Sequence, residues 1–359
     1  MILNSYVKMK LQNKMSYSNF NNIILQAPSV HIGGGLVLLR QILGVKKLSV
    51  KFAQLDERTK KNTDLSIGEK VYYIKPKIFS RLFAELRLWF AVKDSDTVLC
   101  FHNLPPLFPS QAKIVVLVHN PLLVGEKNPL NHTLRTKIRL AIERIWLKIS
   151  RHKNIRYIVQ TKSMEASLKK TLGKHIDVTI FPFAPDRIDF HEGIEPRQKF
   201  DFIYPASGEA HKNHINLLEA WRLLADEGIK PSLAITLDSK KYLNITEVLE
   251  DYIKKFDLKI VNLGHLSPHD ALGLYKQASA LIFPSKAESF GLPLIEAAQY
   301  GLPILAPELD YVRDIAEPRE TFDPSSPRSI ARAVRRFLGN AEPLSKIHSA
   351  EEFWTEVLR

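Results

Sequence analysis

The alternation of short apolar runs with amphipathic stretches restricts the fold of this chain more than any other feature of its sequence. From residue 22 onward, apolar runs typical of buried strands alternate with stretches of helical periodicity, and the pattern occurs in both halves of the chain. Parallel strands joined by crossover helices produce such a pattern. The sequence therefore predicts an α/β protein with two parallel-sheet domains.

The pattern gives each predicted element a residue range. In the first half, strands are predicted at 22–27, 71–74, 97–101, 113–118, 157–160 and 178–181, and helices at 35–45, 78–92, 133–150 and 162–172. In the second half, strands are predicted at 200–204, 232–237, 259–263, 280–283 and 303–306, and helices at 213–227, 245–257, 269–278, 292–300 and 326–338. Open α/β sheets bind ligands beyond the carboxyl ends of their strands, so we expect the functional residues in strand-to-helix loops.

The length of 359 residues also suggests two domains, since one domain usually has about 100 to 200 residues. We predict a polar N-terminal extension over 1–20, a first domain over 21–185, a linker over 186–199, a second domain over 200–340 and a C-terminal helix over 341–359.

The composition excludes several classes of protein. Apolar residues make up 45% and charged residues 25% of the chain, which is typical of a soluble globular protein and not of a disordered or collagenous one. The single cysteine, Cys100, excludes an internal disulfide and a thiolate metal site, so the reducing cytoplasm is the expected compartment. We expect neither a signal peptide nor a membrane-spanning segment, because no apolar run is long enough.

The charge is divided unevenly between the two halves. The net charge is +13, but residues 1–200 carry 33 basic and 15 acidic side chains, whereas residues 201–359 carry 18 and 23. The first half is therefore expected to meet an anionic partner. Nucleic acid, anionic lipid and phosphorylated substrates all satisfy that condition, and motifs must decide between them.

The segment ALIFPSKAESFGLPLIEAAQYGLPILA, residues 280–306, carries the strongest functional signal. It is predicted to form a buried strand, a loop, a helix with Pro293 in its first turn and a second strand; Pro is well tolerated there. Gly291 lets the backbone approach a ligand closely. The N–H groups of Ser289, Phe290 and Gly291 would then form an anion site suited to a diphosphate.

Two carboxylates flank the start of that helix. Glu288 precedes the helix, and Glu296 lies one to two turns inside it among apolar residues. A carboxylate in such surroundings needs hydrogen-bond partners. Ribose or hexose hydroxyls would supply paired donors; the alternative is a structural Glu296 paired with a neighbouring basic residue.

With seven residues between Glu288 and Glu296, this segment resembles the retaining glycosyltransferases of family four. The segments 207–221, 261–285 and 322–338 resemble the C-terminal domain of the same family. The resemblance implies the GT-B fold, an α/β architecture of two Rossmann-like parallel-sheet domains facing a central cleft. It is close over 200–340 and loose over 22–190.

The resemblance also implies roles for the domains and carboxylates. Glu288 would face the donor sugar near its diphosphate, and Glu296 would hold the nucleotide ribose. Residues 21–185 would form the acceptor-side domain and residues 200–340 the nucleotide-sugar-binding domain. The helix at 341–359 would pack back toward the N-terminal domain.

Lys212, just before an amphipathic helix, resembles the family lysine that neutralises the donor diphosphate. A fixed cation there would stabilise the charge that grows on the leaving group; the alternative is a solvated lysine in a helix first turn. The family often has Gly-Arg shortly before this lysine, where this chain has Ala206 and Ser207. We therefore expect Ser207, His211 or Lys286 to compensate in phosphate binding.

A glycine cluster, Gly33, Gly34 and Gly35, separates a predicted strand from a predicted helix. It would let acceptor or phosphate approach a helix N-terminus, as glycines here often do in the family. A tight turn that needs positive φ explains the same residues. The sequence contains neither a GxGxxG fingerprint nor a phosphate-binding P-loop.

His119 follows the predicted strand 113–118 and resembles the family histidine that contacts the donor sugar; the alternative is an ordinary loop histidine. His102, at the end of the neighbouring strand, is a weaker candidate. No HExxH metal motif is present. The resemblance implies that neither a bound metal nor a cofactor is needed.

Two basic helical segments, 75–93 with Trp89 and Phe90 and 134–153 with Trp146, contain many Lys and Arg and one acidic residue each. Such segments are typical of helices that lie on membranes, although their apolar faces could instead complete the N-terminal core. For 75–93 the two interpretations are equal, and 134–153 favours an anionic surface. The candidate membrane-surface residues are Arg135, Lys137, Arg139, Arg144, Trp146 and Lys148. No nucleic-acid motif is present, so nucleic acid is not an expected partner.

Together these features predict a retaining hexosyltransferase that uses a nucleotide-diphosphate sugar. Its acceptor would be a sugar hydroxyl of an oligosaccharide on undecaprenyl diphosphate, for bacterial O-antigen or capsule. The enzyme would be cytoplasmic and peripheral on the inner face of the cytoplasmic membrane. The alternatives are a GT-B sugar-nucleotide epimerase or hydrolase, and a catalytically silent GT-B subunit that binds membrane.

Overall fold

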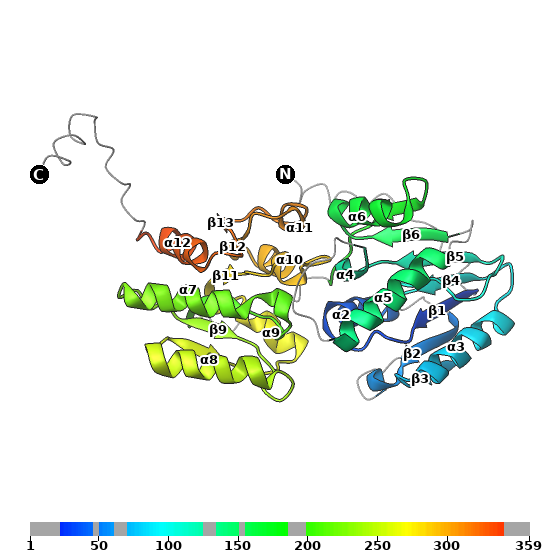
Figure 1. Ribbon diagram of the computed structural model, residues 1–359, viewed down its shortest axis with the longest axis horizontal. Helices are drawn as coiled ribbons and strands as arrows, with labels where there is room; N and C mark the ends of the chain where they lie inside the picture. Colours follow the sequence, from blue (N-terminus) through cyan, green and yellow to red (C-terminus); the bar gives the residue numbers. More distant parts are fainter. Residues whose placement is uncertain are drawn as a thin grey trace, which may run out of the picture. The chain divides into compact units, whose positions relative to one another are not determined.

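The computed structural model describes residues 22–45, 50–60, 70–124, 134–150, 155–185 and 199–340, without the side chains of residues 134, 135, 268 and 269. The chain divides into two compact units, Met1–Asp186 with Glu288–Leu292 and Arg187–Ala287 with Pro293–Arg359. Each unit contains its own parallel sheet covered by helices (Figure 1). The predicted α/β class is confirmed. The predicted extension 1–20, the C-terminal helix 341–359 and all of the linker except Lys199 lie outside the described residues.

The first unit contains a seven-stranded parallel sheet in the order β3-β2-β1-β4-β5-β6-β7. Its strands are β1 Ile23–Ala27, β2 Val50–Asp56, β3 Val71–Ile74, β4 Thr97–Cys100, β5 Lys113–Leu117, β6 Ile155–Val159 and β7 Asp177–Ile180. Its helices are α2 Gly33–Leu43, α3 Ile78–Ala91, α4 Pro121–Val124, α5 Leu134–Ile149 and α6 Lys162–Leu172. The strand order reverses between β1 and β4, and ligands bind beyond the carboxyl ends of strands at such a reversal.

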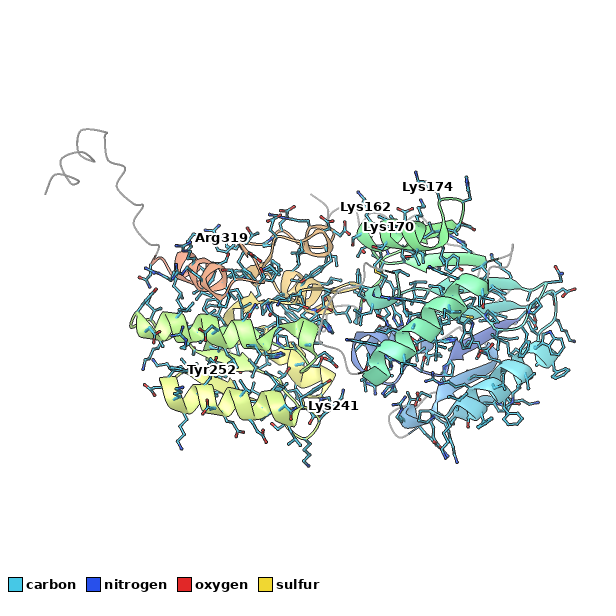
Figure 2. The ribbon with its side chains drawn as sticks, viewed as in Figure 1. Lys162, Lys170, Lys174, Lys241, Tyr252 and Arg319 are labelled. Carbon is cyan, nitrogen blue, oxygen red and sulfur yellow. The ribbon has the colours of Figure 1, made fainter. Side chains whose placement is uncertain are left out.

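Helix α6 shows how the sequence specifies its local structure. Thr161 caps the helix, because its hydroxyl accepts a hydrogen bond from an N–H in the first turn, and Gly173, with φ of 108°, ends it. Lys162 and Lys170 lie on the exposed face of the helix (Figure 2). The buried row repeats every four residues and consists of Met164, Leu168 and Leu172. This pairing of caps and periodicity explains why the sequence predicted α6 with correct bounds.

Two strands were missed in the sequence. Strand β2 contains Lys51, Gln54 and Asp56, which hide its apolar pattern. In the fold, the Gln54 amide donates to the Ala84 carbonyl at 2.9 Å, and Asp56 pairs with Arg58 at 2.7 Å. The other missed strand, β13 Glu320–Phe322, is only three residues long.

The start of helix α2, at the glycine cluster Gly33–Gly35, also differs from the prediction. The predicted helix began at residue 35, after a glycine loop, but α2 begins at Gly33. Gly33 has φ of 66°, whereas Gly34 and Gly35 have no positive φ. The cluster is therefore the first turn of the helix rather than a loop before it.

The second unit contains a six-stranded parallel sheet in the order β10-β9-β8-β11-β12-β13. Its other strands are β8 Phe200–Tyr204, β9 Leu233–Ile235, β10 Ile260–Asn262, β11 Ala278–Ile282 and β12 Ile304–Pro307. Its helices are α7 His214–Asp226, α8 Leu243–Phe256, α9 Pro268–Leu274, α10 Leu292–Gln299, α11 Asp310–Arg313 and α12 Pro327–Phe337, with the short 3-10 turn η2 at Ala210–Lys212.

Trp221 of α7 is central to the core of this unit. Its side chain is fully buried, and its ring meets Phe202 of β8 edge-on at 5.6 Å between centroids. The Phe202 ring also lies 5.6 Å from the ring of Phe337 of α12. The indole N–H of Trp221 donates to the Pro231 carbonyl at 3.0 Å. Phe202 thus links α7, the sheet and α12, while the one polar atom of Trp221 stays satisfied.

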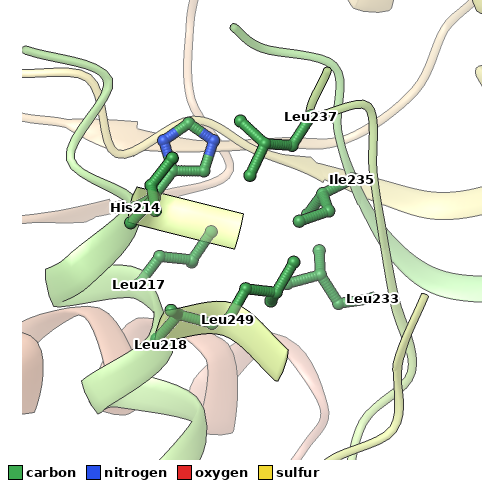
Figure 3. Close-up of a pocket in the computed structure, with 8 residues that line it drawn as sticks. His214, Leu217, Leu218, Leu233, Ile235, Leu237 and Leu249 are labelled. Carbon is green, nitrogen blue, oxygen red and sulfur yellow. The ribbon is translucent and has the colours of Figure 1, made fainter. Parts of the chain in front are cut away.

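A small apolar cavity lies beside α7 and is capped by the ring of His214 (Figure 3). The other lining residues are Leu217, Leu218, Leu233, Ile235, Leu237, Ile245 and Leu249. Within the described residues, the Nε2 atom of His214 is buried without a hydrogen-bond partner. Burial lowers the pKa of His214 to about 4, so the ring is neutral at pH 7 and is compatible with its apolar surroundings.

Replacing Trp221 with alanine should lower the free energy of unfolding by about 3–5 kcal/mol, because a large cavity would form in the core. Urea denaturation of the variant measures this loss. Ile215→Ala, on the same helix but about half exposed, is the matched control and should change it by less than about 0.5 kcal/mol. Equal effects of the two substitutions would contradict the central role of Trp221.

Candidate functional site

Two loops meet at the carboxyl edge of the second sheet, because they follow the neighbouring strands β8 and β11. Asn213 joins them. Its backbone has φ of 64°, and its side-chain amide donates to the carbonyls of Pro284 at 3.0 Å and Pro324 at 2.7 Å. The left-handed backbone suits Asn, which tolerates that region better than most residues. One side chain therefore fixes the loop after β8 to the loop after β11.

Backbone contacts at His211 strengthen this junction. The carbonyl of His211 accepts hydrogen bonds from the Lys286 N–H at 2.8 Å and from the Ser285 hydroxyl at 3.2 Å. The hydroxyl of Tyr311 in turn donates to the Ser285 carbonyl at 2.7 Å. The predicted phosphate-binding candidates His211 and Lys286 are therefore brought together through the backbone.

Lys212 ends the turn η2 and lies just before α7. Its side chain is half-buried, its backbone carbonyl accepts from the Tyr204 hydroxyl at 2.6 Å, and its Nζ lies 6.0 Å from the ring centroid of Phe283. The cation is therefore held at the junction of the two loops, where a fixed positive charge can act on an anion.

A carboxylate lies next to Ser207, in the region where the family often has arginine. Glu209 accepts hydrogen bonds from the hydroxyls of both Ser207 and Tyr242. Gly208 allows this approach, since a Cβ there would lie 2.5 Å from the Tyr242 ring. Burial acts to raise the pKa of Glu209, but the two hydroxyls and the charge of Lys212 hold it below its usual range. Neither Glu209 nor Tyr242 was predicted from the sequence.

Glu296 lies in α10 and is hydrogen-bonded to a tyrosine. The hydroxyl of Tyr275, a buried residue, donates to Oε2 of Glu296 at 2.7 Å, and the Tyr275 ring stacks on Tyr300 at 5.8 Å. Burial raises the pKa of Glu296, whereas the Tyr275 hydrogen bond acts to lower it. Its partner is thus a tyrosine and not the basic residue that a purely structural role predicted. No sequence pattern indicated Tyr275.

The remaining donor-site candidates precede α10. Glu288 and Ser289 are half-buried, and Phe290 is buried. Gly291, immediately before the helix, has φ of 66°, a left-handed conformation that glycine adopts without strain. The structure therefore places these four residues at the start of α10, as the sequence predicted.

His119 lies at the carboxyl end of β5 in the first unit. Its backbone N–H donates to Oδ1 of Asn103 at 2.6 Å, and its ring meets Phe101 edge-on at 5.7 Å. A Cβ at Gly35 would lie 2.9 Å from Cε1 of His119, so the first turn of α2 packs directly on the imidazole. Burial lowers the pKa of His119 to about 4, which leaves a neutral ring that can hydrogen-bond a sugar hydroxyl at pH 7.

His102, the weaker candidate, is a buried residue at the end of β4. Its Nδ1 lies 3.1 Å from the carbonyl oxygen of Gln26, and burial lowers its pKa to about 4. The hydrogen bond and burial are typical of a structural histidine.

The membrane-surface candidates lie on α5. Lys137, Arg139 and Lys148 are exposed. Arg144 donates to the Leu122 carbonyl at 2.6 Å and Trp146 to the Pro105 carbonyl at 3.0 Å, so both bind their own unit. The Arg135 side chain lies outside the described residues.

The described part of the chain contains neither a cluster of metal ligands nor a helix able to span a membrane. No group of three or more His, Cys, Asp or Glu side chains there could hold a metal ion. Among the helices described, none is both long enough and apolar enough to cross a membrane.

Comparison with known structures identifies the fold class as GT-B. Sucrose-phosphate synthase from Thermosynechococcus elongatus aligns with a TM-score of 0.65 and 16% identity over 89% of this chain and 90% of that one. HepE from Anabaena, in complex with UDP and glucose, aligns with a TM-score of 0.60 and 14% identity over 88% and 89% of the two chains. At these identities the similarity shows the fold alone, and it confirms the predicted GT-B architecture.

Sequence comparison supports the predicted family resemblance. Residues 186–352 match the model of the family Glycosyl transferases group 1. The serotype-specific mannosyltransferase WbdA from Escherichia coli is 34% identical over 152 residues, which are 40% of this chain and 18% of WbdA. The chain thus spans about a fifth of the length of this curated relative.

Replacing Tyr275 with phenylalanine should raise the pKa of Glu296 further, because the hydrogen bond to its ionised form is lost. If Glu296 binds the nucleotide sugar, as proposed below, the acid limb of that affinity should then move to higher pH. Calorimetric titrations across pH measure this shift. Tyr252→Phe on α8 (Figure 2), which removes a hydroxyl that donates to Glu219 of α7, is the control and should leave the profile unchanged. An unaltered profile for Tyr275→Phe would contradict the positioning role.

Replacing Gly35 with alanine should displace the His119 ring, because the added methyl group overlaps Cε1. NMR of the imidazole Cε1–H groups measures this displacement: the His119 signal should move, while that of the buried His214 stays in place as an internal control. Gly273→Ala, where no atom lies within 4 Å, should leave both signals unchanged. If the His119 signal did not change in Gly35→Ala, the contact between Gly35 and the His119 ring would be contradicted.

Proposed function

We propose that this protein transfers a hexose from a nucleotide-diphosphate sugar to a sugar hydroxyl, with retention of the anomeric configuration. The observation that supports this most is the junction of two loops in the family-matched region, which holds Lys212 beside the segment leading to Glu288 and α10. A fixed cation and a helix start suit a diphosphate, and a carboxylate inside the helix suits ribose hydroxyls.

The proposed roles follow from these positions. Lys212, His211 and Ser207 hold the diphosphate together with the N–H groups of 289–291, and Glu296 holds the ribose. Glu288 orients the hexose, and His119 contacts it as a neutral hydrogen-bonding group.

The proposed reaction breaks the bond between the anomeric carbon and the diphosphate oxygen and forms a bond to the acceptor oxygen on the same face. The acceptor proton passes to the leaving phosphate, so the step needs no covalent nucleophile from the protein. We propose that it needs neither a bound metal nor a cofactor, since Lys212 supplies the positive charge that stabilises the leaving group.

The proposed acceptor is an oligosaccharide on undecaprenyl diphosphate, and the product belongs to a bacterial O-antigen or capsule. The name of the relative WbdA, a serotype-specific mannosyltransferase, supports a surface polysaccharide and a hexose. To act on such an acceptor, the protein would bind peripherally to the inner face of the cytoplasmic membrane. The exposed Lys137, Arg139 and Lys148 of α5 would there face anionic headgroups.

One observation supports a second candidate function. Ser207 stands where the family often has arginine, and its hydroxyl is bound to the carboxylate of Glu209. A catalytically silent subunit that binds membrane would tolerate this loss of positive charge. A sugar-nucleotide epimerase or hydrolase would use the same donor site without an acceptor.

A panel of nucleotide-diphosphate sugars tests the proposal. One donor should raise the melting temperature of the purified protein, because binding to the folded state alone stabilises it. Lys212→Ala and Glu296→Ala should abolish this rise, whereas Lys254→Ala, an exposed lysine on α8, should not. Release of nucleotide diphosphate that depends on an added glycan acceptor would establish transfer over hydrolysis. Failure of every donor at millimolar concentration would favour the silent subunit.

A further inference from the structure

Helices α3 and α5 both turn apolar side chains toward solvent. On α3, Phe79, Phe83 and Phe90 are 76%, 67% and 78% exposed, far more than large apolar residues usually are. On α5 the exposed isoleucines Ile138, Ile142, Ile145 and Ile149 follow the helical spacing of four, three and four residues, so they form one stripe. These side chains do not complete the core of the first unit.

The two helices and the loop after β4 form one surface. Trp89 of α3 contacts Phe108 at 5.5 Å between ring centroids, and Glu85 accepts from the Leu107 N–H at 2.8 Å. From the other side, Trp146 of α5 donates to the Pro105 carbonyl at 3.0 Å. We define the α3–α5 face by its exposed apolar residues: Ile78, Phe79, Leu82, Phe83, Trp89, Phe90, Leu107, Ile138, Ile142, Ile145 and Ile149.

The exposed charges within the two helices are of one sign. Their acidic residues are withdrawn: Glu85 is buried, and Glu143 is half-buried beside Arg139 at 3.9 Å. The exposed basic residues within the helices are Arg87, Lys137, Arg139 and Lys148; exposed Lys75 and Lys77 precede α3, and exposed Lys93 and Asp94 follow it. The α3–α5 face therefore combines apolar side chains with positive charge and no fully exposed carboxylate within either helix.

This combination fits a lipid surface better than a second copy of the chain. In a symmetric dimer, the basic face of one copy would lie against the same basic face of the other copy. Contact between like charges is unfavourable. An anionic membrane instead offers phosphate groups for the basic residues and an acyl region for the apolar ones. Phenylalanine, tryptophan and isoleucine on one side with lysine and arginine beside them are typical of helices that lie in that interface.

We propose that the α3–α5 face docks on an anionic lipid membrane, with its phenylalanines and isoleucines below the headgroups and its lysines and arginines against the lipid phosphates. This inference deepens the membrane part of the proposed function and does not depend on glycosyl transfer. It names α3, in addition to the basic helix α5, as an element that enters the membrane.

A single-cysteine label tests the depth of insertion. Cys100 is fully buried, so Phe83→Cys supplies the reactive thiol for an environment-sensitive fluorophore. Adding vesicles of phosphatidylglycerol and phosphatidylcholine should shift its emission to the blue, and lipids with a quencher in the acyl chain should quench it. A label at Leu243→Cys, an exposed apolar position on α8, is the matched control and should show neither change. If vesicles neither shifted nor quenched the emission of the Phe83→Cys label, the proposal would be overturned.

Vesicle sedimentation provides the second measurement. The pair Phe79→Ser with Phe83→Ser should lower the partition coefficient for anionic vesicles about tenfold or more, because apolar area no longer leaves water. Leu243→Ser should not lower it. Donor-induced thermal stabilisation should survive the paired substitution, so loss of membrane binding and failure of the proposed donor site are distinguishable.

The acidic segment 341–359, with Glu342, Glu351, Glu352 and Glu356, is the competing occupant of the face. If that segment covers it, deletion of 341–359 would create vesicle binding that the full chain lacks, and the proposal would be wrong. Equal binding of the full chain and the deletion variant supports the membrane as the occupant.

Discussion

The hydrogen bonds that join the loop after β8 to the loop after β11 are the interaction on which the candidate donor site depends. Asn213, whose backbone is left-handed, donates to the carbonyl of Pro284 after β11 and to that of Pro324 after β13, and the His211 carbonyl receives two donors from the loop after β11. Parallel strand pairing brings the loops near one another, but these side-chain contacts fix their relation. Preorganisation of this kind lets a cation such as Lys212 act without rearranging when the leaving group gains charge.

The sequence predicted the parts of the site that follow from local rules. A helix starting at Leu292 with glycine before it, and Glu296 inside it, required only helix-start chemistry and periodicity. Tyr275 could not be found in this way, because it lies 21 residues before its partner Glu296 and meets it only after α9 and α10 have packed. Strand β2 was hidden for a related reason, since Gln54 and Asp56 look exposed until their partners are in place.

Ser207 stands where the family often has arginine, and the structure shows which groups surround it. The Ser207 hydroxyl does not stand alone but shares Glu209 with Tyr242, and Gly208 makes room for the tyrosine ring. Glu209 is held ionised beside Lys212, so the local charge is lower than in a site with both lysine and arginine. If the protein binds a donor diphosphate as proposed, that binding would depend on Lys212 and on backbone N–H groups, because Ser207 supplies no second cation at this position.

Periodicity alone left the role of segment 75–93 undecided, because an apolar helix face looks the same whether it covers a core or a membrane. The structure separates the two uses within one helix. Leu88 and Ala84 face the sheet, whereas Phe79, Phe83 and Phe90 face solvent. A helix that already buries one apolar side gains nothing for folding from a second, exposed one, and exposed apolar patches of this kind mark interaction surfaces. The excess apolar side chains of α3 are therefore best explained by an interaction outside the folded chain.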